Sequence, residues 1–306
     1  MISAAAAGTW TLGDLVVNRM GFGSMRVTQD GPAFGDGAAP SDRSRAITTL
    51  RRAVELGVNH IDTAAFYFSA LRSANELINT ALAPYSDDLV IVTKVGPGRD
   101  TWGNWTDAAR PDQLRGQVEE NLRQLGRDHL DVVNYRRQAS VHSISEHFGA
   151  LTELRDAGLI RHLGISGVEP AHLAEALAIA PVVCVQNAYS VSDRRPESSA
   201  LLQACGEQGI AFVPFFAIAG TRRPGVPSGD GNSGSADMAE PRQLSDIARA
   251  HDATVAQIRL AWTLHQGRHV LAIPGTGNPG HLLENVAAGA IELSDDELAS
   301  LAEISR

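Results

Sequence analysis

The sequence predicts a (β/α)8 barrel, that is, a TIM barrel, with an N-terminal β-hairpin and a C-terminal helix. Eight short apolar strands, each followed by at least one helix, and about 280 residues for the eight units support this fold. Continuous apolar runs are typical of parallel strands that helices cover. A doubly wound sheet requires a Gly-x-Gly-x-x-Gly turn, and Gly21 and Gly23 supply only half of one. We therefore expect residues 1–306 to form a single domain.

The first half of the chain alternates strands and helices. Two apolar segments separated by Gly13 and Asp14, residues 10–12 and 15–17, predict the hairpin. The expected strands are residues 20–25, a segment that ends at Asp62, residues 89–94 and residues 130–136, with a loop at 27–42. Apolar residues spaced by three and four predict helices around 47–54, 73–82, 114–125 and 144–154. Ser41 or Ser44 is expected to cap the first of these helices, and Gly57 to end it.

The second half repeats the pattern. Its expected strands are residues 160–166, 182–186, 210–216 and 270–273. Its expected helices are residues 170–178, 196–206, 241–250, 255–266 and 282–288, with a terminal helix at 295–304. Residues 219–239 are rich in Gly, Pro and Ser and form the one low-complexity segment of the chain.

Composition excludes several classes of protein. A net charge of −9 argues against a nucleic-acid surface, which requires clustered Lys and Arg. Cys184 and Cys205 are the only cysteines, too few for a disulfide framework or a four-cysteine metal site. The first residues lack a basic segment before their alanine run, unlike a signal peptide, and no apolar stretch reaches transmembrane length. We expect a cytoplasmic protein that binds neither nucleic acid nor membrane.

Four side chains fall where the predicted strands end, which is the catalytic face of such barrels. They are Asp62, Tyr67, Lys94 and Arg136. A phenol with its ordinary pKa of about 10 is a weak acid at neutral pH, and a nearby cation lowers that pKa. Asp62 would keep Lys94 charged, so that Tyr67 donates a proton to a carbonyl oxygen while a hydride reaches the carbon.

Each of these residues also has a structural interpretation. Asp62 is equally suited to capping a helix, Lys94 to a structural ion pair, and Tyr67 to a core position with an exposed hydroxyl. The combination at neighbouring strand ends favours catalysis. Arg136 cannot release a proton at useful pH, which leaves it four roles: stabilising an alkoxide, holding a carboxylate or phosphate, pairing with Asp62, or forming a plain structural salt bridge.

The segment Asp62-Thr63-Ala64-Ala65-Phe66-Tyr67, followed by a strand that ends in Lys94, resembles the D-T-A-x-x-Y and Lys signatures of the aldo-keto reductases. The resemblance runs nearly end to end and is nearest to the bacterial pyridoxal reductase, or pyridoxine 4-dehydrogenase, branch. It implies an NADPH-dependent enzyme that reduces an aldehyde or ketone, with a pyridoxal-like substrate. The family usually has His where this chain has Arg136, but the pyridoxal-reductase branch shares the Arg.

The same resemblance assigns the cofactor residues. Ser166 and Gln186 would hold the nicotinamide carboxamide, and Phe215 replaces the Tyr that usually stacks on the ring. Gly167 stands where the family has Asn. The turn from the eighth strand into a helix would bind the adenosine phosphate and adenine through Gly275, Thr276, His281, Glu284 and Asn285. Gly275 and His281 replace a Lys and an Arg of the best-known members. Arg222 and Arg223 either clamp the pyrophosphate or are solvated.

Three aromatic residues are candidates for the substrate wall: Phe68, Trp102 and Trp105. Aromatic side chains in a loop beside a site usually indicate binding, and the alternative is hydrophobic cover over the barrel rim. Phe68 replaces a Gly of the family and adds bulk beside Tyr67. Two other functions remain open: a specialised-metabolism reductase of a bulkier carbonyl or imine, and a non-catalytic sensor of nicotinamide nucleotides. No pattern predicts a metal site.

Overall fold

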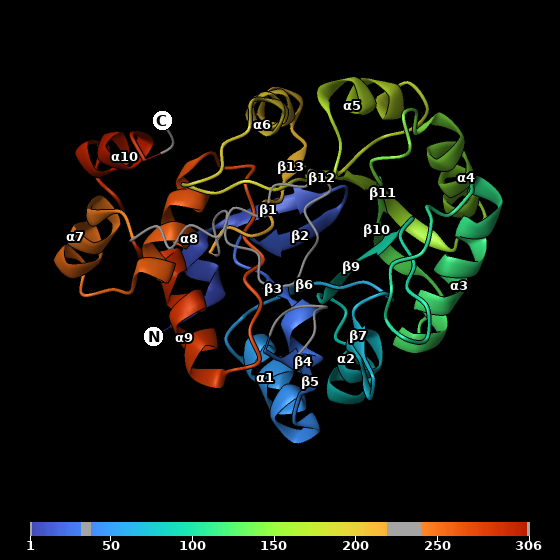
Figure 1. The fold of residues 1–306 in the computed structure, drawn as a ribbon, viewed down its shortest axis with the longest axis horizontal. Helices are drawn as coiled ribbons and strands as arrows, with labels where there is room; N and C mark the ends of the chain where they lie inside the picture. Colours follow the sequence, from blue (N-terminus) through green and yellow to red (C-terminus); the bar gives the residue numbers. More distant parts are fainter. Residues whose placement is uncertain (1, 32–37, 219–239, 305–306) are drawn as a thin grey trace.

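Seven parallel strands form one curved sheet in the computed structural model, which describes residues 2–31, 38–218 and 240–304 (Figure 1). In spatial order the strands are β13 (Ala211–Phe212), β12 (Cys184–Gln186), β11 (Ile160–Ser166), β10 (Leu130–Arg136), β9 (Val90–Val95), β6 (His60–Asp62) and β3 (Phe22–Gly23). The five between the two edges contain mostly buried residues on both faces, as expected for parallel strands between a filled interior and outer helices.

Residues 270–272 lie between the two edges of this sheet. Val270 forms a parallel bridge with Phe212 of β13, and Ala272 forms one with Met20, just before β3. The backbone hydrogen bonds agree, because Leu271 N donates to Phe212 O at 3.0 Å and Ala272 N to Arg19 O at 2.8 Å. This segment therefore occupies the eighth strand position and joins the edges. The predicted (β/α)8 architecture is confirmed.

Helices surround the ring of strands (Figure 1). They are α1 (Arg43–Glu55), α2 (Ala74–Leu82), α3 (Leu114–Leu125), α4 (Ser145–Asp156), α5 (Pro170–Leu177), α6 (Pro196–Gln208), α7 (Arg242–Ala250), α8 (Val255–His265), α9 (Pro279–Ala287) and α10 (Asp295–Ala302). The predicted cap of α1 is wrong. Asp42 is the N-cap and accepts a hydrogen bond from Arg45 N at 2.7 Å, whereas the Ser41 hydroxyl is buried against Val27 O.

Two helices end at a glycine whose backbone is left-handed. Gly126 after α3 has a φ of 65° and Gly209 after α6 has a φ of 68°. Because glycine has no Cβ, it adopts this conformation without steric cost. Gly126 ends its helix as predicted, whereas α6 continues past the predicted end at residue 206. None of the described helices is both long and apolar enough to cross a membrane.

Several short elements accompany the barrel. The additional strands are β4 (Gln29–Asp30), β5 (Ala39–Pro40), β7 (Phe68–Ser69) and β8 (Arg72–Ser73), and the 3₁₀ turns are η1 (Ala4–Ala7), η2 (Ser24–Val27), η3 (Pro111–Gln113) and η4 (Ala288–Ala290). The β4–β5 pair lies in the segment that the sequence predicts as loop. The antiparallel β7–β8 hairpin follows Tyr67 directly.

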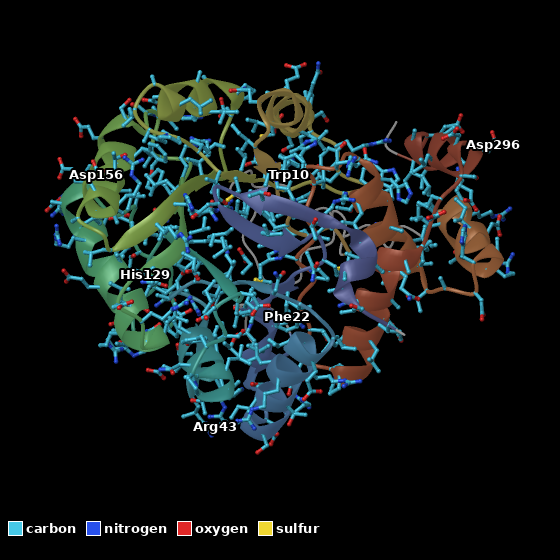
Figure 2. All side chains as sticks on the ribbon, turned by 180° about the vertical axis from the view of Figure 1, so that it is seen from behind. Trp10, Phe22, Arg43, His129, Asp156 and Asp296 are labelled. Carbon is cyan, nitrogen blue, oxygen red and sulfur yellow. The ribbon has the colours of Figure 1, made fainter. Side chains whose placement is uncertain are left out.

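The hairpin of β1 (Thr9–Leu12) and β2 (Leu15–Asn18) lies across one end of the barrel, as Figure 2 shows from behind. Leu12 and Val17 are buried there against Val90 and Val132, which stand near the starts of β9 and β10. Burying such side chains stabilises the fold by roughly 1.5–3 kcal/mol each. The hairpin therefore closes the N-terminal end of the barrel and leaves the C-terminal ends of the strands for a site.

Candidate active site

Polar side chains lie at or near the C-terminal ends of five neighbouring strands. Asp62 ends β6, Lys94 lies in β9, and Arg136, Ser166 and Gln186 end β10, β11 and β12. The strand register aligns three of them, since Arg136 pairs with Ser166 and Ser166 with Gln186. The ion pair described next joins the other two, Asp62 and Lys94. Because parallel strands end at the same edge of a sheet, residues far apart in sequence meet at this mouth.

A buried ion pair lies at the centre of the mouth. Lys94 Nζ is 2.6 Å from Asp62 Oδ1 and donates a second hydrogen bond to Thr63 O at 3.0 Å. The two residues are only 5% and 3% exposed. Burial acts to lower the pKa of Lys94, but the charges and hydrogen bonds of Asp62 and Tyr67 together outweigh burial and raise that pKa above its ordinary value. Lys94 is therefore charged at neutral pH.

The phenol of Tyr67 lies next to this pair. Lys94 Nζ is 4.9 Å from the centroid of the Tyr67 ring. Burial raises the pKa of Tyr67 above its ordinary value, whereas the charges of Lys94 and Arg136 act to lower it. Lys94 thus acts in the direction expected from the sequence, but burial has the larger effect. The phenol keeps its proton at neutral pH, as a proton donor must.

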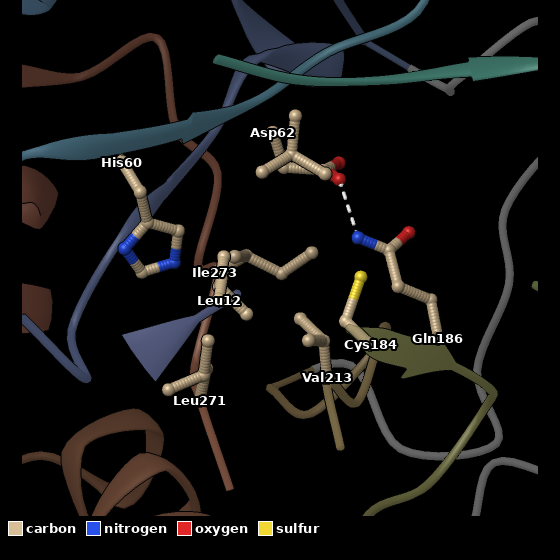
Figure 3. Close-up of a pocket in the computed structure, with 9 residues that line it drawn as sticks. Leu12, His60, Asp62, Cys184, Gln186, Val213, Leu271 and Ile273 are labelled. Carbon is tan, nitrogen blue, oxygen red and sulfur yellow. Dashed lines mark hydrogen bonds between the residues drawn. The ribbon is translucent and has the colours of Figure 1, made fainter. Parts of the chain in front are cut away.

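A third contact on the ion pair was not expected from the sequence. Gln186 Nε2 donates a hydrogen bond to Asp62 Oδ2 at 2.7 Å (Figure 3). Each oxygen of the carboxylate therefore has its own donor. The other polar atom of the amide, Gln186 Oε1, is buried and has no hydrogen-bond partner. Such an atom costs free energy unless a ligand or water satisfies it, so Gln186 presents an acceptor to whatever enters the mouth.

The barrel interior beneath Gln186 is almost filled. A cavity of about 10 Å³ remains, lined by His60, Cys184 and Leu12 among others (Figure 3). His60 occupies the space that Gly21 leaves, because a Cβ on Gly21 would lie 2.1 Å from His60 Nε2. Burial lowers the pKa of His60 to about 4. The imidazole is therefore neutral at neutral pH and adds no charge below Asp62.

Aromatic side chains gather on the loops that follow β6 and β9. The guanidinium of Arg99 lies 4.4 Å from the centroid of the Phe68 ring and 5.7 Å from that of Trp105, and Nη1 donates to Phe68 O at 2.7 Å. Arg99 therefore joins the two loops, a role that the sequence analysis missed. Phe68 and Trp105 are brought together, whereas the Trp102 side chain is 86% exposed and does not belong to a formed wall.

Comparison with known proteins identifies the family. The model of the aldo/keto reductase family matches residues 19–306. The chain belongs to this family. The pyridoxine 4-dehydrogenase of Escherichia coli (strain K12) is 41% identical to it over 98% of this chain and 99% of its own length. Both the family and the branch predicted from the sequence are thus confirmed, and as an aldo/keto reductase the chain is an oxidoreductase.

Two solved aldo/keto reductases have the same fold. A thermostable one, solved with the inhibitor epalrestat, is 29% identical, with a TM-score of 0.78 over 97% of this chain and 99% of that chain. One from Klebsiella pneumoniae, solved with NADP and acetate, is 26% identical, with a TM-score of 0.72 over 96% of this chain and 93% of that chain. The architecture therefore extends over nearly the whole chain.

Two departures from the usual aldo/keto reductase pattern are linked in space. Arg136 Nη1 donates to Ser166 Oγ at 3.1 Å, and the guanidinium lies 4.8 Å from the centroid of the Phe215 ring. Gly167, where the family has Asn, has a φ of 67°, and a Cβ there would lie 2.6 Å from Arg136 Nη1. The glycine makes room for the arginine. The two differences, which look independent in the sequence, form one local rearrangement.

The expected adenosine side of this aldo/keto reductase lies around the turn before α9. A cleft of about 500 Å³ is lined there by Gly275, Thr276 and His281, among others. Asn285 is buried, Glu284 half-buried and His281 exposed. Gly275 has no room for a side chain, because a Cβ would lie 2.4 Å from Gly23 O. Arg222 and Arg223, for which the sequence left a pyrophosphate contact or solvation open, lie outside the described residues.

Proposed function

We propose that this aldo/keto reductase reduces an aldehyde or ketone to an alcohol with NADPH, that pyridoxal is its leading substrate, and that the whole chain acts as one catalytic domain. The observation that carries the chemistry is the buried contact of 2.6 Å between Lys94 and Asp62 beside Tyr67. A phenol next to an ammonium that is charged at neutral pH can release its proton to a developing alkoxide, because the ammonium stabilises the phenolate that remains.

The roles follow from the positions. Tyr67 gives its proton to the carbonyl oxygen, Lys94 stabilises the resulting phenolate, and Asp62 keeps Lys94 charged and in place. Arg136 would stabilise negative charge on the same oxygen, since it is a cation at the end of β10 whose charge acts on Tyr67. In the oxidative direction Tyr67 is the base that removes the proton of the alcohol.

The residues around the mouth fit a nicotinamide cofactor, which would supply the hydride that no side chain can donate. Gln186 Oε1 is buried without a partner, and an amide N–H of a carboxamide would satisfy it. Ser166 and the Phe215 ring both contact Arg136, and they would give the nicotinamide a polar contact and an apolar surface. The Klebsiella pneumoniae relative, solved with NADP, supports the choice of cofactor.

The substrate class rests on two observations. The relative with 41% identity is a pyridoxine 4-dehydrogenase. In this chain Arg99 contacts the rings of both Phe68 and Trp105. Trp105 also packs edge-to-face on Phe66, which packs in the same way on Tyr67. Aromatic side chains of this kind bind planar rings through offset or edge-to-face contacts. A heteroaromatic aldehyde such as pyridoxal fits this chemistry better than a flexible aliphatic one.

An absorbance assay tests the proposal. Purified protein is mixed with NADPH and with pyridoxal, methylglyoxal or a bulky cyclic ketone, and the loss of nicotinamide absorbance is followed. We expect the highest kcat/KM with pyridoxal. A higher value with the bulky ketone would favour the specialised-metabolism reductase. Tight NADPH binding without turnover of any carbonyl would contradict an enzymatic role and favour the nucleotide sensor.

Arg136 provides a second test. We expect Arg136→His to lower kcat by about ten- to a hundredfold while activity remains measurable, because His can still donate a hydrogen bond to the oxyanion but carries no permanent charge. Steady-state rates with pyridoxal, together with NADPH titrations, measure this change. Complete loss of turnover with intact NADPH binding would show that Arg136 has a role that His cannot fill.

A further inference from the structure

The cleft beside α9 has one wall that the family resemblance did not assign. This wall consists of η2, β4 and the start of α1, and it contributes Arg26, Asp30 and Arg45 to the cleft. The cleft measures about 500 Å³, which is within the range of small-molecule sites. Two arginines thus face a concave space of ligand size across from the turn that precedes α9.

The two arginines are differently engaged. Arg45 Nη2 lies 2.6 Å from both carboxylate oxygens of Asp30, and the two side chains are 40% and 55% exposed. An ion pair so exposed contributes little to stability, so Arg45 can exchange its partner at low cost. Arg26 is half-buried and makes no side-chain hydrogen bond or ion pair within the described part of the chain. Its charge is available to a ligand.

The opposite wall is poorly equipped to hold an anion. Gly275 cannot carry a cationic side chain, since a Cβ there would lie 2.4 Å from Gly23 O. The first free N–H groups of α9 are already bonded, because Asn278 Oδ1 accepts from Gly280 N at 2.8 Å and from His281 N at 3.4 Å. An anion in this cleft therefore finds its permanent positive charge on Arg26 and Arg45.

We infer that Arg26 and Arg45 bind the 2′-phosphate of NADPH, an inference that rests on the function proposed above. A phosphate monoester carries more negative charge than the carboxylate of Asp30 and accepts two parallel hydrogen bonds from a guanidinium. The phosphate takes over Arg45 from Asp30 and also contacts Arg26. The cations for the cofactor phosphate thus come from η2 and α1, and not from positions 275 and 281.

Binding of two nucleotide fragments tests this assignment without turnover. Adenosine 2′,5′-bisphosphate carries the 2′-phosphate, and 5′-AMP lacks it. We expect Arg26→Gln and Arg45→Gln each to raise the Kd of the bisphosphate by about tenfold, and both together by about a hundredfold, with the Kd of 5′-AMP changed less than about twofold. Isothermal titration calorimetry at fixed salt measures these constants, and NADPH and NADH titrations should follow the same pattern.

Two further variants sharpen the test. Arg52→Gln is the matched control, because Arg52 is also an ion-paired α1 arginine, with a side chain 47% exposed, but does not line the cleft. It should leave both constants unchanged. Asp30→Asn removes the competing carboxylate and should tighten bisphosphate binding by about two- to threefold. A general loss of folding would weaken binding in every variant, so it cannot explain tighter bisphosphate binding by Asp30→Asn.

The inference is overturned if the double variant binds the bisphosphate as tightly as the unchanged protein does. It is also overturned if the Kd of 5′-AMP rises by the same factor as the Kd of the bisphosphate. Either result would leave the proposed function intact as long as NADPH still supports carbonyl reduction. Conversely, bisphosphate binding that depends on Arg26 and Arg45 in a protein without turnover would support the phosphate site and contradict the reductase. The two proposals therefore fail separately.

Discussion

Tyr67→Phe should lower kcat for carbonyl reduction by about a thousandfold or more, within the range that general acid catalysis contributes. The phenylalanine keeps the ring beside Lys94, where the ammonium lies 4.9 Å from its centroid, and removes only the hydroxyl that carries the proton. The Kd of NADPH should change by less than about twofold, because the variant leaves Ser166 and Gln186 in place. Steady-state rates and cofactor titrations measure the two effects separately.

Tyr85→Phe is the matched control for this variant. Tyr85 also loses a hydroxyl, which donates to Leu125 O at 2.7 Å, but it lies on the outer wall of the barrel and not at the mouth. We expect a modest loss of stability and an unchanged kcat. If Tyr67→Phe reduces carbonyls as fast as the unchanged protein, Tyr67 is not the acid and the proton must come from elsewhere.

Lys94→Met should be the most destabilising single substitution at the mouth. It leaves the carboxylate of Asp62 buried, with Gln186 as its remaining side-chain donor. Removing one partner of a buried ion pair typically costs about 3–5 kcal/mol. Turnover should be lost as well, because no ammonium then stabilises the phenolate. Urea denaturation measures the free energy of unfolding, and the absorbance assay measures turnover.

A second substitution separates stability from catalysis. Asp62→Asn combined with Lys94→Met removes both charges, so that no buried charge is left without a partner. The double variant should regain a large part of the lost stability but none of the activity. Free energies that simply add across the two sites would mean that the residues are not coupled in the folded protein, and the assigned role of Asp62 would then be wrong.

The sequence predicts the barrel well because its signals are local. Apolar runs and helix periodicity depend on neighbouring residues, so the predicted helices agree closely with the observed ones. The predicted strands lie at the observed positions, but β3 and β13 are shorter than the predicted segments 20–25 and 210–216. The mouth could also be located, since strand ends place Asp62, Lys94 and Arg136 on one face. Local signals fail where neighbouring residues can play the same role. Asp42 caps α1, although Ser41 and Ser44 are also residues that commonly cap helices.

The remaining features depend on contacts between distant parts of the chain. Gln186 and Asp62 are 124 positions apart, and nothing in either strand indicates that they share a hydrogen bond. The sequence likewise does not predict that Gly275 lies close to Gly23. The pKa of Tyr67 could not be predicted either, because burial and the charge of Lys94 act in opposite directions and only the fold determines how much of the phenol is covered.

The positions of the four tryptophans allow ligand binding to be followed by intrinsic fluorescence. Trp10 lies in the hairpin at the closed end, and Trp262 is buried in α8 at 2% exposure. Trp102 and Trp105, at 86% and 37% exposure, are the two on the loop beside the mouth. A solvent-exposed indole emits fluorescence at longer wavelength than a buried one. A ligand that binds over this loop and covers these two indoles should therefore shift their emission to shorter wavelength. Substrate binding can therefore be followed by fluorescence without attaching a dye.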